Sequence, residues 1–126
     1  MLLVTLLGIA ILFGLAVFQF LLILRRPLGN FAWGGQHKVL PPKLQIASCF
    51  AVALYMIFAL FLLIKAGLVD GIMNAAVVNI GMWIFTAFFI IGIFLNGISR
   101  SKKERFLMTP ITFILALIFL AVSITG

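Results

Sequence analysis

The sequence predicts an all-α fold, an integral membrane four-helix bundle with antiparallel up-down topology. Three observations support this prediction. Hydrophobic residues make up 66% of the 126-residue chain and charged residues only 9%, whereas a soluble domain carries about 25% charged residues. Four long stretches contain no charged residue, and the basic residues gather in two of the links between them. Such a chain cannot cover a water-facing surface, so we expect it to be solvated by lipid.

The four charge-free stretches, the second extended by Lys65 at its end, give the expected spans of a single transmembrane domain, residues 1–126: about 2–24, 45–65, 75–96 and 107–125. The first would be about 34 Å long as a helix, enough to cross a hydrocarbon core of about 30 Å. No charge precedes it, and Arg25 and Arg26 follow it, which is typical of an uncleaved span rather than a signal peptide.

Prolines bear on where two of the helices begin. Pro41 and Pro42 fit the start of the second helix, because proline is favoured in a helical first turn. Pro110 leaves the start of the fourth helix open. The helix either begins at Pro110 with Thr109 as its N-cap, which makes it short for a bilayer, or begins earlier and contains Pro110.

The basic residues predict the orientation of the chain. The first and third links share one side of a four-span bundle and hold eight of the nine basic residues, and only Lys65 borders the second link. The positive-inside rule places that side in the cytoplasm and both termini outside a bacterial plasma membrane. The eight residues are Arg25, Arg26, Lys38, Lys43, Arg100, Lys102, Lys103 and Arg105.

Anionic lipid head groups on the cytoplasmic side are the expected partners of these cations. No nucleic-acid partner is expected, because no segment would fold into a basic surface.

Small and polar residues recur at helical spacing and predict the faces that pack together, because such residues allow close approach and hydrogen bonding between helices in lipid. Asn79, Trp83 and Thr86 form a second polar line, which could face a neighbouring subunit. The four predicted stripes are Thr5, Gly8, Leu12, Leu15 and Gln19; Gln45, Ser48, Val52, Tyr55 and Ala59; Gly81, Phe85, Phe88, Gly92 and Asn96; and Thr112, Ala116, Phe119 and Ser123.

The first link, with the stretch FAWGGQHKVLPPK, and three amides near the same ends of the helices form the candidate binding site for a ligand or lipid head group. Its residues have two interpretations. They could make only a hairpin bend and inter-helix hydrogen bonds, or they could line a small polar cavity open to the cytoplasm, with His37 and Lys38 near an anionic group. The candidate residues are Trp33, Gly34, Gly35, Gln36, His37, Lys38, Gln19, Gln45 and Asn96.

Catalytic, metal and cofactor sites are not expected. Cys49 is the single cysteine and His37 the single histidine, so one chain cannot build a zinc or haem site. The two acidic residues, Asp70 and Glu104, lie outside the predicted spans, whereas proton-coupled carriers keep an ionisable group within a span. We expect a protein that is not an enzyme.

The segments WGGQHKVLPPKLQIAS and NGISRSKKERFLMTPITFILAL resemble an uncharacterised bacterial family of small four-span membrane proteins. The resemblance covers nearly the whole chain but departs from the family pattern after Phe106, where the family has an acid and this chain has Met108 or Thr109. The family brings no assigned activity, so the resemblance implies the architecture alone. The matching residues are Trp33, Gly34, Gly35, Val39, Leu40, Pro41, Asn96, Phe106 and Pro110.

Two functions are therefore predicted. The first is a multi-pass bacterial plasma-membrane protein that is non-enzymatic, either accessory or lipid-interacting. The alternative is a small transporter or channel subunit, which would need a homo-oligomer because four short helices enclose little space.

Overall fold

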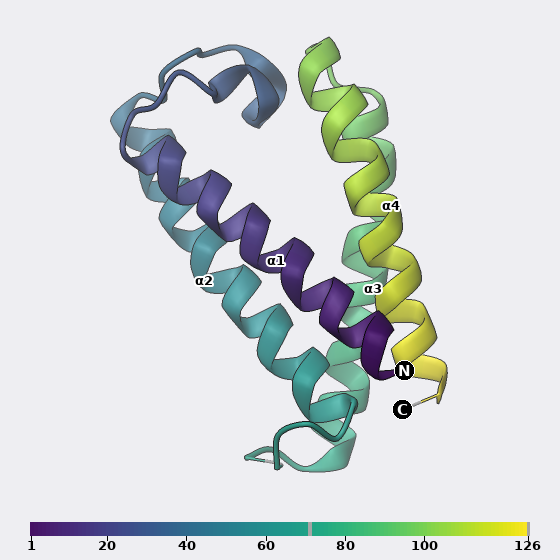
Figure 1. Cartoon of the computed structure of the whole chain (residues 1–126). Coiled ribbons are helices and arrows are strands. Elements are labelled where there is room, and N and C mark those ends of the chain that lie inside the picture. The colour runs from purple at the N-terminus through teal and green to yellow at the C-terminus, as the bar shows by residue number, and fades with distance from the viewer. Residues whose placement is uncertain (71, 126) are drawn as a thin grey trace.

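The computed structural model describes residues 1–70 and 72–125, and the fold is all-α, as predicted (Figure 1). Four long helices alternate in direction, and two short 3-10 turns lie within the first link. The elements are α1 (Leu2–Ile23), η1 (Gly29–Phe31), η2 (Trp33–Gly35), α2 (Pro42–Lys65), α3 (Ala75–Gly97) and α4 (Lys102–Thr125). Each long helix is apolar and long enough to cross a bilayer, which indicates a multi-pass membrane protein.

The fourth helix begins at Lys102, ahead of the predicted residue 107, and Pro110 lies inside it. Of the two alternatives left open by the sequence, the earlier start with Pro110 inside the helix is the one observed, and Thr109 is not the N-cap. Ser101 starts the helix instead, because its carbonyl accepts the Arg105 N–H (3.0 Å) and its hydroxyl accepts the Glu104 N–H (3.3 Å). The early start gives α4 a length of about 36 Å, and most of the predicted basic loop becomes its first two turns.

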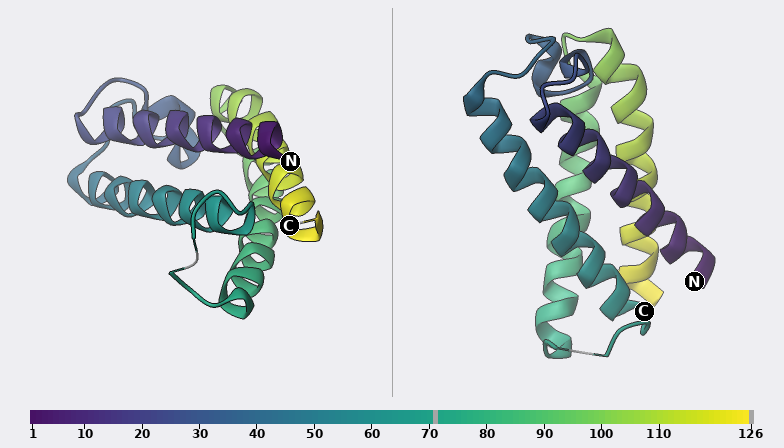
Figure 2. Two further views of the ribbon diagram at one scale, coloured as in Figure 1. Left: turned by 60° about the horizontal axis from the view of Figure 1, so that its bottom comes forward. Right: turned by 60° about the vertical axis from the view of Figure 1, so that its left-hand side comes forward.

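The helices form two hairpins, α1–α2 and α3–α4, that cross each other obliquely (Figures 1 and 2). The hairpins approach each other at the end that holds both chain termini, and they diverge toward the opposite end. The first link and the α3–α4 link lie together at that opposite end, which we call the basic end because it carries the eight cations named above.

Small residues explain why the hairpins meet near the termini. Gly8 is buried where α1 crosses both neighbours: a Cβ atom there would lie 2.9 Å from Leu62 Cδ2 and 3.0 Å from Ile118 Cγ2. In lipid, where the hydrophobic effect does not drive helices together, this close approach supplies the packing energy. The neighbouring Thr5 is also fully buried.

An aromatic cluster fills the centre of the bundle. The ring of Phe58 on α2 lies 4.7–6.1 Å from four other phenylalanine rings, mostly in tilted or edge-to-face orientations, which favours contact between ring edges and faces. These four rings belong to Phe85, Phe88, Phe89 and Phe119.

The predicted packing faces agree with the structure on α1 and α4, where Gly8, Gln19, Ala116 and Ser123 are buried. On α3 the predicted stripe does contact neighbouring helices, since Phe85 packs on Phe58 and Asn96 bonds Thr112, but the most buried side chains lie about one residue further along. The buried side chains of α3 are Val78, Met82, Thr86 and Phe89.

Thr86 is buried against α4, so it is not part of the polar line that could face a neighbouring subunit. Its hydroxyl donates to Met82 O (2.8 Å) and lies 3.4 Å from Ser123 Oγ on α4.

Gly8→Leu is expected to lower the stability of the bundle by about 1–3 kcal/mol, because the added carbons have no space between α1, α2 and α4. Thermal unfolding in mild detergent, followed by circular dichroism, measures the effect. The matched control is Gly14→Leu on the same helix, where a Cβ atom would meet nothing within 4 Å. Equal unfolding temperatures for the two variants would contradict the proposed close approach.

Candidate functional site

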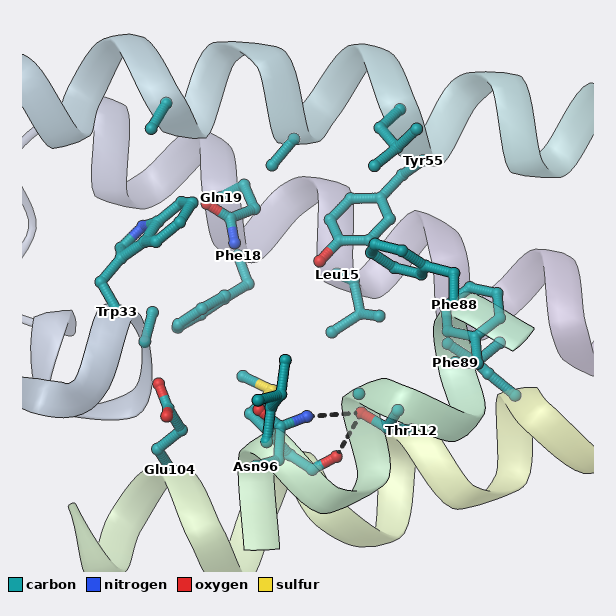
Figure 3. A pocket seen from close by; sticks show the side chains of 18 of the residues that line it. Leu15, Phe18, Gln19, Trp33, Tyr55, Phe88, Phe89, Asn96, Glu104 and Thr112 are labelled. Atoms are coloured by element: carbon teal, nitrogen blue, oxygen red, sulfur yellow. Dashed lines mark hydrogen bonds between the residues drawn. The ribbon is translucent and has the colours of Figure 1, made fainter. Parts of the chain in front are cut away.

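A cavity of about 700 Å³ lies between the two hairpins where they diverge, at the basic end (Figure 3). This volume is in the range of small-molecule sites, about 300–1,000 Å³. All four long helices and the first link line it. The cavity exists because the hairpins touch near the termini but are held apart by the link at the other end.

The most exposed residues of the lining lie on α2 and α3, which indicates that the cavity opens sideways between these two helices. Its lining side chains on these two helices include Phe50, 73% exposed, and Leu95, 61% exposed. In contrast, lining residues on α1 and α4 such as Gln19, Glu104 and Leu115 are buried. Because both rim residues are apolar and belong to helices that can cross a bilayer, the opening faces the region that lipid tails would occupy.

The two ends of the cavity differ in chemistry (Figure 3). Gln19, Trp33 and Glu104 lie together at one side, and Phe88 and Phe89 lie at the far side, against the aromatic cluster. The lining is therefore polar toward the basic end and mainly aromatic toward the centre of the bundle, where the Tyr55 hydroxyl is also exposed to the cavity.

Glu104 is the charged residue of the lining. It lies in the first turn of α4 and is only 7% exposed. Its Oε2 accepts a hydrogen bond from the backbone N–H of Gly34 (3.2 Å). Neighbouring cations point elsewhere: the Arg105 guanidinium donates to Ser99 O (3.2 Å), and Lys103 Nζ lies 5.7 Å from the centre of the Phe31 ring. The carboxylate thus joins the first link to α4.

The turn at Trp33–Gly35 has an unusual backbone, since all three residues have positive φ, at 52°, 76° and 70°. This region is accessible to glycine but costs a residue with a Cβ about 1–2 kcal/mol. Trp33 adopts it with its indole Nε1 donating to Ser48 Oγ on α2 (3.2 Å). Gly35 packs against Ser101, whose hydroxyl donates to Asn30 O. The link is therefore attached to both hairpins.

The three amides predicted for the site have different roles. Gln19 and Asn96 line the cavity, but Gln45 does not. Gln45 Nε2 donates to Ile23 O (2.8 Å) at the end of α1, and Asn96 Nδ2 donates to Thr112 Oγ1 (2.8 Å) on α4. Gln19 is buried, and its Oε1 has no hydrogen-bond partner among the described residues.

The predicted site residues of the first link fall into two groups, those that line the cavity and those that do not. Trp33 and Gly34 line the cavity, whereas Gly35, Gln36, His37 and Lys38 do not. Gln36, His37 and Lys38 are exposed, on the part of the link that turns away from the bundle. The main chain there has a structural role, because Lys38 O accepts the Gly29 N–H (2.9 Å).

Glu104 was missing from the predicted site, although one sequence signal pointed to it. Ser101 and Glu104 have the spacing of a capping box, Ser-x-x-Glu before an apolar run. Interpreted as a capping box, this spacing predicts the observed start of α4 and places Glu104 beside the first link. In the usual motif this glutamate binds the cap residue's own N–H, but here Ser101 N–H bonds Ser99 Oγ (3.2 Å) and Glu104 binds Gly34.

The residues that line the cavity indicate what kind of molecule it could hold. Within residues 1–70 and 72–125, no group of three or more His, Cys, Asp or Glu side chains is placed to hold a metal ion. Glu104 lies in the lining without a second acid or a histidine beside it. The cavity suits an elongated molecule with an apolar body and a polar end.

Comparison of the chain with family models, curated protein sequences and solved structures finds no match. The resemblance of the first link to a family of small four-span membrane proteins therefore stays a prediction, and the fold and cavity carry the functional argument.

Gly35→Ala is expected to loosen the first link, because a Cβ there would collide with Ser101 as well as strain a positive φ. Trypsin should then cut after Arg25 or Lys38 several times faster than in the unsubstituted protein. Gly34→Ala is the matched control, since it has a similar φ but nothing within 4 Å of its Cβ. Equal cleavage rates in the two variants would show that the Gly35–Ser101 contact does not hold the link.

Proposed function

We propose that this protein is a non-enzymatic, lipid-interacting protein of the bacterial plasma membrane, and that its cavity receives a phospholipid from the surrounding bilayer. The observation that carries the proposal is the sideways opening between α2 and α3, with the exposed apolar rim residues Phe50 and Leu95. A lipid could enter through this opening without leaving the membrane. Its acyl chain would contact Leu54, Phe88 and Phe89, and its head group would stay at the basic end.

The orientation follows from charge. The basic end faces the cytoplasm by the positive-inside rule, and both termini lie outside. Exposed cations such as Arg26, Lys43, Arg100 and Lys102 then attract anionic head groups of the inner leaflet, each contributing about 1 kcal/mol near the surface.

A channel or carrier subunit has less support. The aromatic cluster around Phe58 stands between the cavity and the end that holds the termini, and Phe88 and Phe89 form the far side of the cavity. A carrier built on this chain would need a homo-oligomer, which native mass spectrometry from mild detergent would detect.

A phospholipid with a photoreactive diazirine in its acyl chain tests the proposal, presented with an ethanolamine head group and, separately, with a glycerol head group. At least one of them should label lining residues of α2 and α3 after irradiation in nanodiscs, as mapped by peptide mass spectrometry. Ala51→Trp, which fills the cavity, should reduce this labelling several-fold. Ala53→Trp on the exposed face of α2 should not.

Two results would contradict the lipid-binding proposal: labelling spread evenly over the exposed faces of all helices, or equal labelling in the two tryptophan variants.

The orientation has its own test. Alkaline phosphatase fused after Gly126 should be active in cells, because it folds outside the cytoplasm, and green fluorescent protein fused at the same place should be dark. The reverse result would mean that the basic end faces outward.

A further inference from the structure

The Glu104 carboxylate is only 7% exposed, and two features offset part of the cost of burying its charge: it lies in the first turn of α4, where a negative charge is stabilised, and it accepts the Gly34 N–H. A glutamine at this position would keep an acceptor for the Gly34 N–H but would lose the charge. A buried carboxylate without a cationic partner is costly, since burial removes its hydration. Glu104 nevertheless lines the cavity, and Arg105 and Lys103 are engaged with Ser99 and Phe31. The charge is therefore available for a ligand.

Gln19 provides a second, independent indication of a ligand. It is 7% exposed, it lines the polar side of the cavity with Glu104, and its Oε1 has no partner. Buried side-chain acceptors are normally hydrogen-bonded. Rotating the amide about its last torsion turns this oxygen toward the cavity, where the Tyr55 hydroxyl also points. The cavity thus offers the Glu104 carboxylate and the Gln19 oxygen as acceptors, and a ligand with several N–H donors would satisfy both together.

We infer that this side of the cavity binds the primary ammonium of a phosphatidylethanolamine head group, with Glu104 as its anionic partner and Gln19 as a further acceptor. This inference rests on the proposed function, because the lipid's acyl chain would occupy the apolar side. A primary ammonium has three N–H donors, so it can satisfy both residues together. The Trp33 ring beside Glu104 (Figure 3) also suits a cation near its face.

The surrounding cations favour a zwitterion over a simple amine or an anionic lipid. Arg100 and Lys102 are exposed near the start of α4, and they would repel a free amine but attract a phosphate. An anionic lipid such as phosphatidylglycerol has a phosphate but no positive group that could pair with the Glu104 carboxylate. Exposed cations are screened over about 8–10 Å by salt, whereas a buried contact is screened much less. The ammonium–Glu104 contact therefore decides the selection.

The experiment compares three phospholipids with identical acyl chains: phosphatidylethanolamine, phosphatidylcholine and phosphatidylglycerol. The full chain is placed in nanodiscs containing equal amounts of all three, transferred to mild detergent, and its retained lipids are identified by native mass spectrometry. We expect phosphatidylethanolamine to be retained roughly tenfold over each of the others, the size of one charge-assisted hydrogen bond. Phosphatidylcholine carries a positive charge but no N–H donors, so it tests whether the N–H donors of the ammonium are needed for retention.

Glu104→Gln should abolish this preference, because it keeps an acceptor for Gly34 N–H but removes the charge. Gln19→Leu should reduce it by a smaller factor. Asp70→Asn is the matched control: it removes the other acid of the chain, which is exposed and outside the cavity, and the preference should be unchanged. Circular dichroism and the trypsin assay above show whether the variants fold with the link in place.

The possible failures are distinguishable. Equal retention of the three lipids, or an unchanged preference in folded Glu104→Gln, would overturn the inference and leave the proposed lipid site standing if cavity labelling persists. Retention of phosphatidylcholine equal to that of phosphatidylethanolamine would overturn the role of the N–H donors. Loss of cavity labelling with both head groups would overturn the proposed function itself.

Discussion

The contact between the Trp33–Gly35 turn and the first turn of α4 is the constraint on which the rest of the molecule depends. A non-helical segment at the edge of a bilayer must satisfy its backbone groups within the protein or in water. Glu104 satisfies the Gly34 N–H, Ser101 satisfies Asn30 O, and Trp33 reaches across to Ser48 on α2. Together these bonds fix the link between the hairpins at one end, while small residues such as Gly8 let the hairpins meet at the other.

The cavity is a direct consequence of that asymmetry. Two hairpins in contact near the termini and held apart at the basic end leave a wedge of space that the link only partly fills. The far side of this space is aromatic, and the near side holds a buried carboxylate and a buried amide with an unpartnered oxygen. A phospholipid has the matching distribution, with its polar group and its chain at opposite ends.

The sequence predicted the fold well because membrane helices leave a strong signal: long charge-free stretches and a marked segregation of cations. It also predicted the buried faces of α1 and α4. On α3 the predicted residues contact α2 and α4, but the fully buried side chains, such as Thr86 and Phe89, were not in the predicted stripe, because α3 packs between two helices and buries a wider face than one stripe. The charged residues Lys102–Arg105 favour a loop by composition, but α4 begins at Lys102. The Ser101–Glu104 spacing is the sequence feature that predicts this helix start.

The site was only partly predictable. Of the residues that the sequence predicts for the site, Trp33, Gly34, Gln19 and Asn96 line one cavity. His37 attracted attention as the single histidine, but it is exposed and does not line the cavity. The positive φ values of the turn and the long-range bond between Gly34 and Glu104 arise from tertiary contacts, so no local pattern reports them.

Distance measurement by electron paramagnetic resonance between spin labels, in lipid nanodiscs, tests the central claim most directly. One pair joins the natural Cys49 on α2 with Phe94→Cys on α3, at the basic end. The other joins Leu3→Cys with Ile124→Cys near the termini, with Cys49 replaced by serine; all four positions are exposed. The account predicts that Glu104→Ala changes or broadens the first distance and leaves the second unchanged, whereas an unchanged first distance would contradict it.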